Sequence, residues 1–328
     1  MCSRIRTACF CLASAFVLSL YCSASPAGSK LLWLVPPGSQ VVAGFENYHD
    51  PGHHGQLLLT TRNNRLDLAD WQAIAGVDHN RAFEEVVEVA ASSIGGQLSD
   101  HMLLVAGRFS QAAIFKSLEL NGAKKIERDG QTVMLIEPFP REKGLLVGTR
   151  WLIILQDRLV MLGTPKMVQA SLRRYLNHAE VDMILRERLS QLPSNVSSWN
   201  VLSSMSRSPT QYKAPLPSSP WAKFFEGANV MIVGAHFGPK IHLHFSLHAS
   251  EDRGAEFFAQ KSRFFAEVFA PERTGGSRTP RLHELEIAPD RVQGSIELSS
   301  KQFDAWSDWT NNFGRPPAIP DRNASSGQ

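Results

Sequence analysis

The chain has 328 residues, a formal net charge of +3, and 43% hydrophobic and 20% charged residues. This hydrophobic content is typical of a globular protein, and the length is sufficient for one large domain or two ordinary ones. Lysine and arginine form no block and aromatic residues are not interleaved with them, so the charge pattern excludes a nucleic-acid-binding protein.

The chain begins with the pattern of a secretory signal peptide. Arg4 and Arg6 precede an apolar run over residues 8–21, and small residues follow this run. A positive start, a short apolar core and a small-residue exit are typical of an exported protein. We predict a mature protein that starts at Ser25 or Gly28, is periplasmic or secreted, and has a formal charge that falls from +3 to about +1 with the loss of the two leader arginines.

All four cysteines lie in this leader, so the mature chain has none. Disulfides, cysteine-bound metal and a thiol nucleophile are therefore excluded from its function. Two alternatives concern the leader itself. An uncleaved membrane anchor is disfavoured because the apolar run is short against the roughly 20 residues that a spanning helix needs. A lipoprotein acylated on Cys22 is disfavoured because the bulky Tyr21 precedes that cysteine. No later apolar run approaches spanning length, so we expect no transmembrane segment after cleavage.

Residues 28–193 alternate between strand and helix patterns. The uninterrupted apolar run around Leu104 is typical of a strand buried on both faces. Ser110 is suited to cap a helix, and the Thr164-Pro165 pair predicts a second helix start with the hydroxyl as its cap. The Asp129-Gly130 pair predicts a tight hairpin. The predicted elements are strand 40–45, helices 56–59 and 68–74, strands 85–90 and 101–107, helix 110–120, hairpins 126–136 and 151–162, and helices 164–176 and 181–191.

A similar order of elements follows in residues 194–312. It comprises strand 199–202, helix 221–225, strands 229–237 and 240–249, helix 250–269, hairpin 281–298 and helix 302–309. From this partial repeat we predict an α+β protein made of two related modules, each a mostly antiparallel sheet with helices packed on one face. The predicted domains are a signal peptide at 1–27, modules at 28–193 and 194–312, and a disordered tail at 313–328.

Several segments resemble a layout found in exported bacterial proteins typical of acidobacterial genomes. They are LLWLVPPGSQVVAGFEN at 31–47, GVDHNRAFEEVVEVA at 76–90, HMLLVAGRF at 101–109, RLVMLGTPKMVQASLRRYL at 158–176 and LRERLSQLPSNVSSWNVLS at 185–203. The shared motifs are turn glycines and strand cores, and that family has no assigned activity, cofactor or catalytic residue. The resemblance therefore implies an exported, non-catalytic protein and carries over no site residue.

Histidines gather in two neighbouring predicted strands. His242, His244 and His248 share one face because strand side chains alternate, and His236 lies in the preceding strand. Such a group is a candidate site for Zn²⁺ or Cu²⁺. The alternative is that these are polar residues on the open face of a sheet, because the intervening residues are apolar and form the buried face.

No familiar catalytic motif, phosphate loop or dinucleotide fingerprint occurs in the sequence. We therefore predict an exported, soluble, non-catalytic binding or structural protein of the envelope. Its partner would be an envelope protein or peptide, bound at a sheet edge, at loops or in a groove between the two modules. The alternative is a metal-binding or metal-dependent periplasmic protein that uses the strand of His242 and His244.

Overall fold

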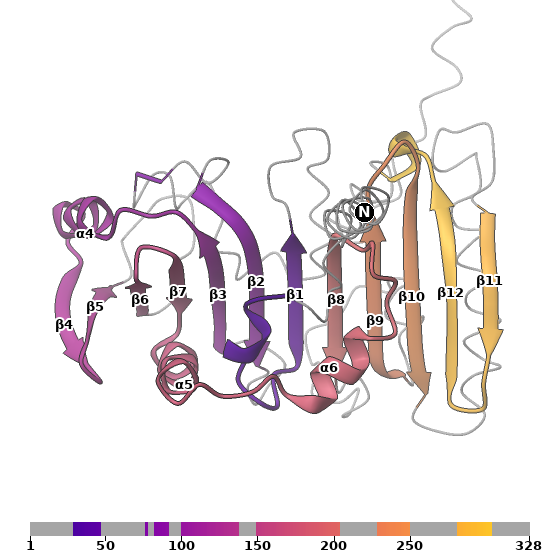
Figure 1. Ribbon diagram of the computed structural model, residues 1–328, viewed down its shortest axis with the longest axis horizontal. Helices are drawn as coiled ribbons and strands as arrows, with labels where there is room; N and C mark the ends of the chain where they lie inside the picture. Colours follow the sequence, from indigo (N-terminus) through magenta and orange to yellow (C-terminus); the bar gives the residue numbers. More distant parts are fainter. Residues whose placement is uncertain are drawn as a thin grey trace, which may run out of the picture.

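The computed structural model describes residues 29–46, 76–77, 82–91, 100–137, 149–203, 228–249 and 281–303. Their strands form one twelve-stranded sheet in the order β11-β12-β10-β9-β8-β1-β2-β3-β7-β6-β5-β4, as Figure 1 shows from right to left. All its pairs are antiparallel. The α+β class with a mostly antiparallel sheet is therefore confirmed.

The elements closely follow the predicted order. The strands are β1 (Val41–Glu46), β2 (Phe83–Ala91), β3 (Asp100–Gly107), β4 (Lys124–Arg128), β5 (Gln131–Ile136), β6 (Arg150–Leu155), β7 (Leu159–Gly163), β8 (Ser198–Ser203), β9 (Ala228–His236), β10 (Ile241–Ala249), β11 (Arg281–Ile287) and β12 (Arg291–Leu298). The helices are the 3₁₀ turn η2 (Leu32–Leu34), α4 (Gln111–Leu120), α5 (Pro165–Leu176) and α6 (Met183–Leu189).

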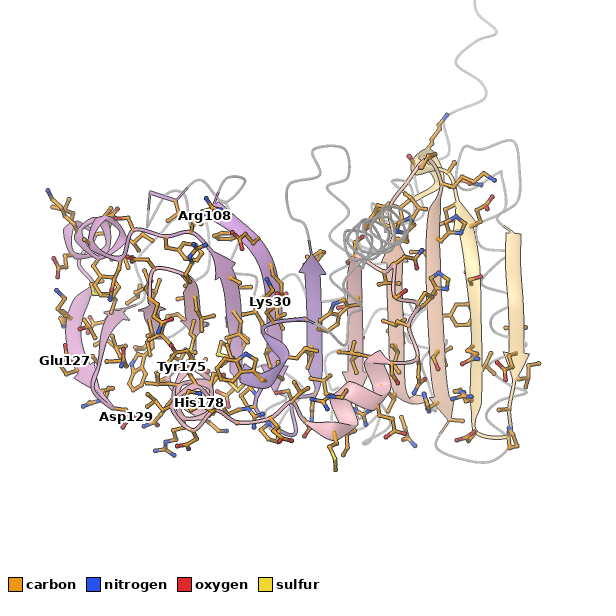
Figure 2. All side chains as sticks on the ribbon, in the orientation of Figure 1. Lys30, Arg108, Glu127, Asp129, Tyr175 and His178 are labelled. Carbon is orange, nitrogen blue, oxygen red and sulfur yellow. The ribbon has the colours of Figure 1, made fainter. Side chains whose placement is uncertain are left out.

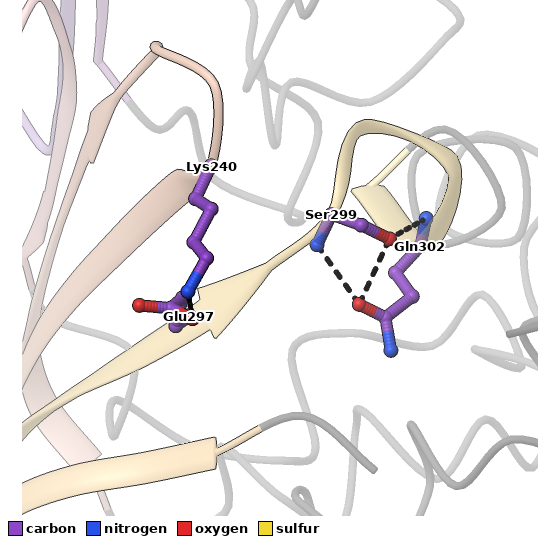
Figure 3. A network of polar contacts seen from close by, with 4 residues as sticks. All are labelled: Lys240, Glu297, Ser299 and Gln302. Carbon is purple, nitrogen blue, oxygen red and sulfur yellow. Dashed lines mark hydrogen bonds and ion pairs between the residues drawn. The ribbon is translucent and has the colours of Figure 1, made fainter. Parts of the chain in front are cut away.

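Local turn and cap chemistry explains several boundaries. Asp129 and Gly130 both have positive φ, 50° and 73°, which is the geometry of a two-residue hairpin turn. The Ser110 hydroxyl accepts from the Ala113 amide and begins α4 as predicted. Thr164 precedes α5, but its side chain makes no capping bond, so that part of the prediction is wrong. After β12, the Ser299 amide and hydroxyl donate to Gln302 Oε1, and the Gln302 amide donates back to Ser299 Oγ, forming a capping box (Figure 3).

The strand around Leu104 is central and buried on both faces. β3 lies between β2 and β7. Leu104 packs in a cluster with α5, whereas Leu103 and Val105 point to the opposite face and pack with α4. Leu104 and Val105 are fully buried, which confirms the interpretation of this apolar run.

Helices cover both faces of the sheet, which corrects the expectation of helices on one face only. On one face, η2, α5 and α6 contribute Leu34, Leu172 and Leu189 to the first core cluster. On the other, α4 contributes Ile114 and Leu118 to the second cluster. The sequence around α4 does not indicate on which face of the sheet this helix packs. An amphipathic helix can bury its apolar stripe equally well against either face of a strand that is apolar on both faces.

The two predicted modules share the sheet rather than forming separate ones. β1 pairs with β8 along five residues, from Val41 opposite Leu202 to Phe45 opposite Ser198. Gly44 lies opposite Trp199 at this junction, and the indole occupies the space that a glycine Cβ would need. Main-chain hydrogen bonding is therefore continuous from one half of the sheet to the other.

Some predictions fall outside the described residues. These are the signal peptide, the helices at 56–59, 68–74, 221–225 and 250–269, most of the helix at 302–309, and the tail at 313–328. In the described part of the chain, no helix has the length and apolarity required to cross a membrane.

Candidate functional site

The strand register places the predicted histidines on one face of the sheet. On β10, His242, His244, Ser246 and His248 alternate with the buried residues Ile241, Leu243 and Leu247. On β12, the residues opposite them are polar as well: Glu297, Ser295, Gln293 and Arg291. We call these eight residues of β10 and β12 the histidine face.

This face continues the surface that α5 and α6 cover in the first half of the sheet. Ser246 is paired with Ile232 of β9, and Ile232 is paired with Val201 of β8. Both apolar residues belong to the core cluster that contains α5 and α6. The side chains on this surface therefore change from apolar to polar between β9 and β10.

Gln191, just after α6, contacts the strand at which the sheet surface changes from apolar to polar side chains. Gln191 Oε1 accepts from the Ser246 hydroxyl at 3.0 Å and lies 3.0 Å from His248 Nε2. Ser246 is almost fully buried and His248 is half-buried. The expectation of a face without helical cover is therefore wrong at His248, where the residues after α6 reach over the strand.

Burial lowers the pKa of His248 below its usual value of 6.5. Desolvation of the ring is the main cause, and the nearby positive charge of Arg291 acts in the same direction. The imidazole is consequently neutral at neutral pH. A lowered pKa is the behaviour of a partly buried histidine, not of one on an open face.

Ser246 and His248 do not form an activated nucleophile. Their side chains lie 3.3 Å apart, at a distance that a serine–histidine pair could use. However, the amide oxygen of Gln191 can only accept, so its contact with His248 Nε2 requires a proton on that nitrogen. A protonated Nε2 cannot remove the Ser246 proton. The three side chains therefore form a structural hydrogen-bonded cluster.

His236 and His242 lie directly opposite each other on β9 and β10, and Glu297 is the next residue across on β12. His236 Nδ1 is 2.8 Å from the Asn195 carbonyl oxygen and must donate to it. Lys240 forms an ion pair with Glu297 (Figure 3). His236, His242 and Glu297, whose side chains could each bind a metal ion, thus form a row. Two of them already have partners in the protein, namely the Asn195 carbonyl for His236 and Lys240 for Glu297.

A metal site is not formed by this row as it stands. In the described parts of the chain, no three His, Cys, Asp or Glu side chains lie together in a way that could hold a metal ion. The Zn²⁺ or Cu²⁺ assignment to His236, His242, His244 and His248 stays a prediction. What the arrangement offers chemically is a dense set of neutral and charged hydrogen-bonding groups.

Gln191 is the member of this site that the sequence did not reveal. It lies 57 residues from His248 in the chain and at the end of a predicted helix, where a polar residue is unremarkable. Only the pairing of β8, β9 and β10 beneath α6 brings it to the histidines. No local sequence signal could have identified it.

No protein-family model and no curated protein matches the sequence of this chain. Among solved structures, one described as crystal form I of TP0453 is similar, with a TM-score of 0.47 and 11% sequence identity. The similarity covers 86% of this chain and 97% of that chain. A likeness at this level assigns no function.

Proposed function

We propose that the protein is an exported, non-catalytic binding protein whose recognition surface is the histidine face. Its partner would be a polar segment of an envelope protein or peptide, held by hydrogen bonds to the partly exposed side chains of His242, His244 and Gln293. The change from apolar to polar side chains between β9 and β10 is the observation that carries this proposal.

The strand order of the two halves allows their corresponding strands to be compared. The first half has the order β1-β2-β3-β7-β6, and the second has β8-β9-β10-β12-β11, so that β3 corresponds to β10. We infer that the halves derive from one duplicated unit, into which the β4–β5 hairpin was inserted. On the same sheet surface, β3 carries Met102 and Leu104 beneath α5, where β10 carries its histidines. This difference supports a role for the second half that the first half does not share.

Two other surfaces considered for binding are less suited to it. The edge strand β4 carries Lys124, Lys125, Glu127 and Arg128, and Glu127 and Asp129 mark this charged edge in Figure 2. Charged edge strands discourage the addition of another strand. A groove between the two modules is also disfavoured, because β1 and β8 are hydrogen-bonded neighbours in one sheet.

Export is part of the proposal and rests on the leader sequence. The first described residues are compatible with it, because Ser29 is buried and its hydroxyl donates to the Glu85 carboxylate. Cleavage ahead of Ser25 or Gly28 would leave this anchoring contact intact.

Site-specific crosslinking tests the proposed surface. A photoreactive benzoylphenylalanine would replace His244, and a control protein would carry it at Lys116, an exposed position on α4. Irradiation of cells should give a discrete crosslinked product from position 244 and none of that mass from position 116. Identical product patterns from both positions, or no product from position 244, would contradict the proposal.

A further inference from the structure

A second set of polar side chains lies in the first half of the sheet, far from the histidine face in the strand order. His101 is on β3, Thr164 directly follows β7, and Arg150 begins β6. The Thr164 amide donates to the His101 carbonyl oxygen at 2.9 Å. Gly163 of β7 lies opposite both Met102 of β3 and Trp151 of β6. One residue further along these strands, His101, Thr164 and Arg150 therefore lie side by side in one row. At the usual strand spacing the row is about 10 Å long.

The side chains of this row point to the face that carries α4. His101 alternates with Met102 and therefore shares its side with Leu103, and Arg150 likewise shares its side with Leu152. Leu103 and Leu152 both belong to the core cluster that contains α4. The row thus lies on the surface opposite to the one that continues into the histidine face.

All three side chains are buried and incompletely hydrogen-bonded. Their exposed fractions are 6% for His101, 7% for Thr164 and 5% for Arg150. Among the described residues, both ring nitrogens of His101, the Thr164 hydroxyl and Arg150 Nε have no hydrogen-bond partner. Buried polar atoms are satisfied in the great majority of cases, so three neighbouring exceptions require an explanation.

The charges of these three side chains determine which kind of ligand the row would bind. Arg150 donates to the Thr149 carbonyl oxygen at 3.2 Å, and none of its described contacts is an ion pair. The described carboxylate that influences it, Asp100, is bound by Lys166 at 3.0 Å. Burial lowers the pKa of His101 to about 4, so this ring is neutral at neutral pH. The row therefore has one buried positive charge, which is costly without a counter-ion.

We propose that His101, Thr164 and Arg150 form a binding site for one small oxyanion, a carboxylate or a phosphate-type group. Arg150 supplies the positive charge and forked N–H donors, a geometry that matches oxyanions. The Thr164 hydroxyl and one N–H of His101 supply further donors. The site is separate from the histidine face, so it stands or falls independently of the proposed function.

Thermal unfolding of the full mature chain in chloride solution tests this site. Inorganic phosphate, sulfate and acetate are each added against sodium chloride of equal ionic strength. At least one of them should raise the melting temperature with a saturable dependence, and the comparison of acetate with phosphate identifies the oxyanion class. Phosphate and sulfate also stabilise proteins non-specifically by exclusion from their surface. Only the saturable part therefore supports the site, and its absence with all three anions would overturn the proposal.

Two variants separate a specific site from general effects. Arg150→Met should abolish the saturable shift, whereas Arg128→Met, on the exposed edge strand β4, should retain it. Thr164→Val keeps the side-chain shape and should weaken the apparent affinity roughly three- to tenfold, as expected for one hydrogen bond. If Arg150→Met does not fold, the Thr164→Val series still decides the matter. An unchanged affinity in Thr164→Val, or a saturable shift that survives in Arg150→Met, would contradict the assignment.

Discussion

The indole of Trp199 lies against Gly44 across the pair of strands that joins the two halves of the sheet. A Cβ at position 44 would lie closer to atoms of the indole ring than non-bonded atoms can approach. Because the buried Trp199 is held by the first core cluster, it cannot move aside without disturbing its neighbours there. This contact makes the junction between β1 and β8 sensitive to a single methyl group.

Gly44→Ala should therefore lower the free energy of unfolding by about 1–3 kcal/mol, the usual cost of overpacking. Gly238→Ala is the matched control, because a Cβ there would meet its nearest atom, the Lys240 carbonyl oxygen, at an ordinary 3.5 Å. Urea denaturation of both variants provides the measurement. Equal stability of the two variants would show that β1 and β8 are not packed in this way.

Acid should destabilise the protein through His101. Its folded pKa of about 4 lies below the unfolded value of 6.5, so the unfolded chain binds a proton first as the pH falls. Desolvation is the main cause, with the positive charge of Arg150 adding to it and Asp100 opposing it. Stability should decline from pH 6.5 towards pH 4, by about 2–3 kcal/mol from this residue.

The comparison of the unmodified protein with His101→Gln isolates this contribution. Both proteins are unfolded with urea at several pH values, in solutions that contain neither phosphate nor carboxylate buffers. The variant should lose less stability between pH 6.5 and pH 4 than the unmodified protein. Parallel pH profiles for the two proteins would mean that His101 titrates alike in the folded and unfolded states.

The arrangement of the strands explains how far the sequence could predict this fold. Turn pairs such as Asp129-Gly130 and the apolar run around Leu104 specify structure locally, and both predictions are confirmed. Pairing between distant strands is different, because alternation defines which side chains share a face but not which strand lies alongside. The pairing of β1 with β8, and hence the single sheet, could not be obtained from periodicity.

The same limit applies to the candidate sites. Alternation along β10 correctly placed His242, His244 and His248 on one face, since that is a property of one strand. Gln191 and the row of His101, Thr164 and Arg150 arise from contacts between separate elements. Thr164 illustrates the difficulty, because its position before Pro165 predicts a cap, while its hydroxyl has no hydrogen-bond partner in the described part of the chain.

Metal analysis tests the alternative function. Protein purified natively without chelators should contain no stoichiometric Zn²⁺ or Cu²⁺, and a chelator should not change its melting temperature, because His236 and Glu297 already have partners in the protein. One bound ion per chain, lost in the His242→Ala/His244→Ala variant, would instead establish the metal-binding function.

Intact mass of the protein from envelope fractions tests export. We expect a mature chain that starts at Ser25 or Gly28, because both positions follow alanine in a small-residue context. Ser29 would then be retained for its contact with Glu85. A product that keeps Met1, or one acylated on Cys22, would contradict a cleaved signal peptide and a soluble periplasmic protein.

Binding to a purified partner tests the role of the histidine face most directly. The partner is the protein identified by crosslinking from position 244, and its affinity is measured for the mature chain and for His242→Ser/His244→Ser. His178→Asn is the control, because His178 is exposed after α5 and its φ of 48° is one that asparagine tolerates. We expect about tenfold weaker binding by the double variant, equal to about 1.4 kcal/mol, with an unchanged melting temperature and full affinity in the control. Undiminished affinity of a folded double variant would contradict it.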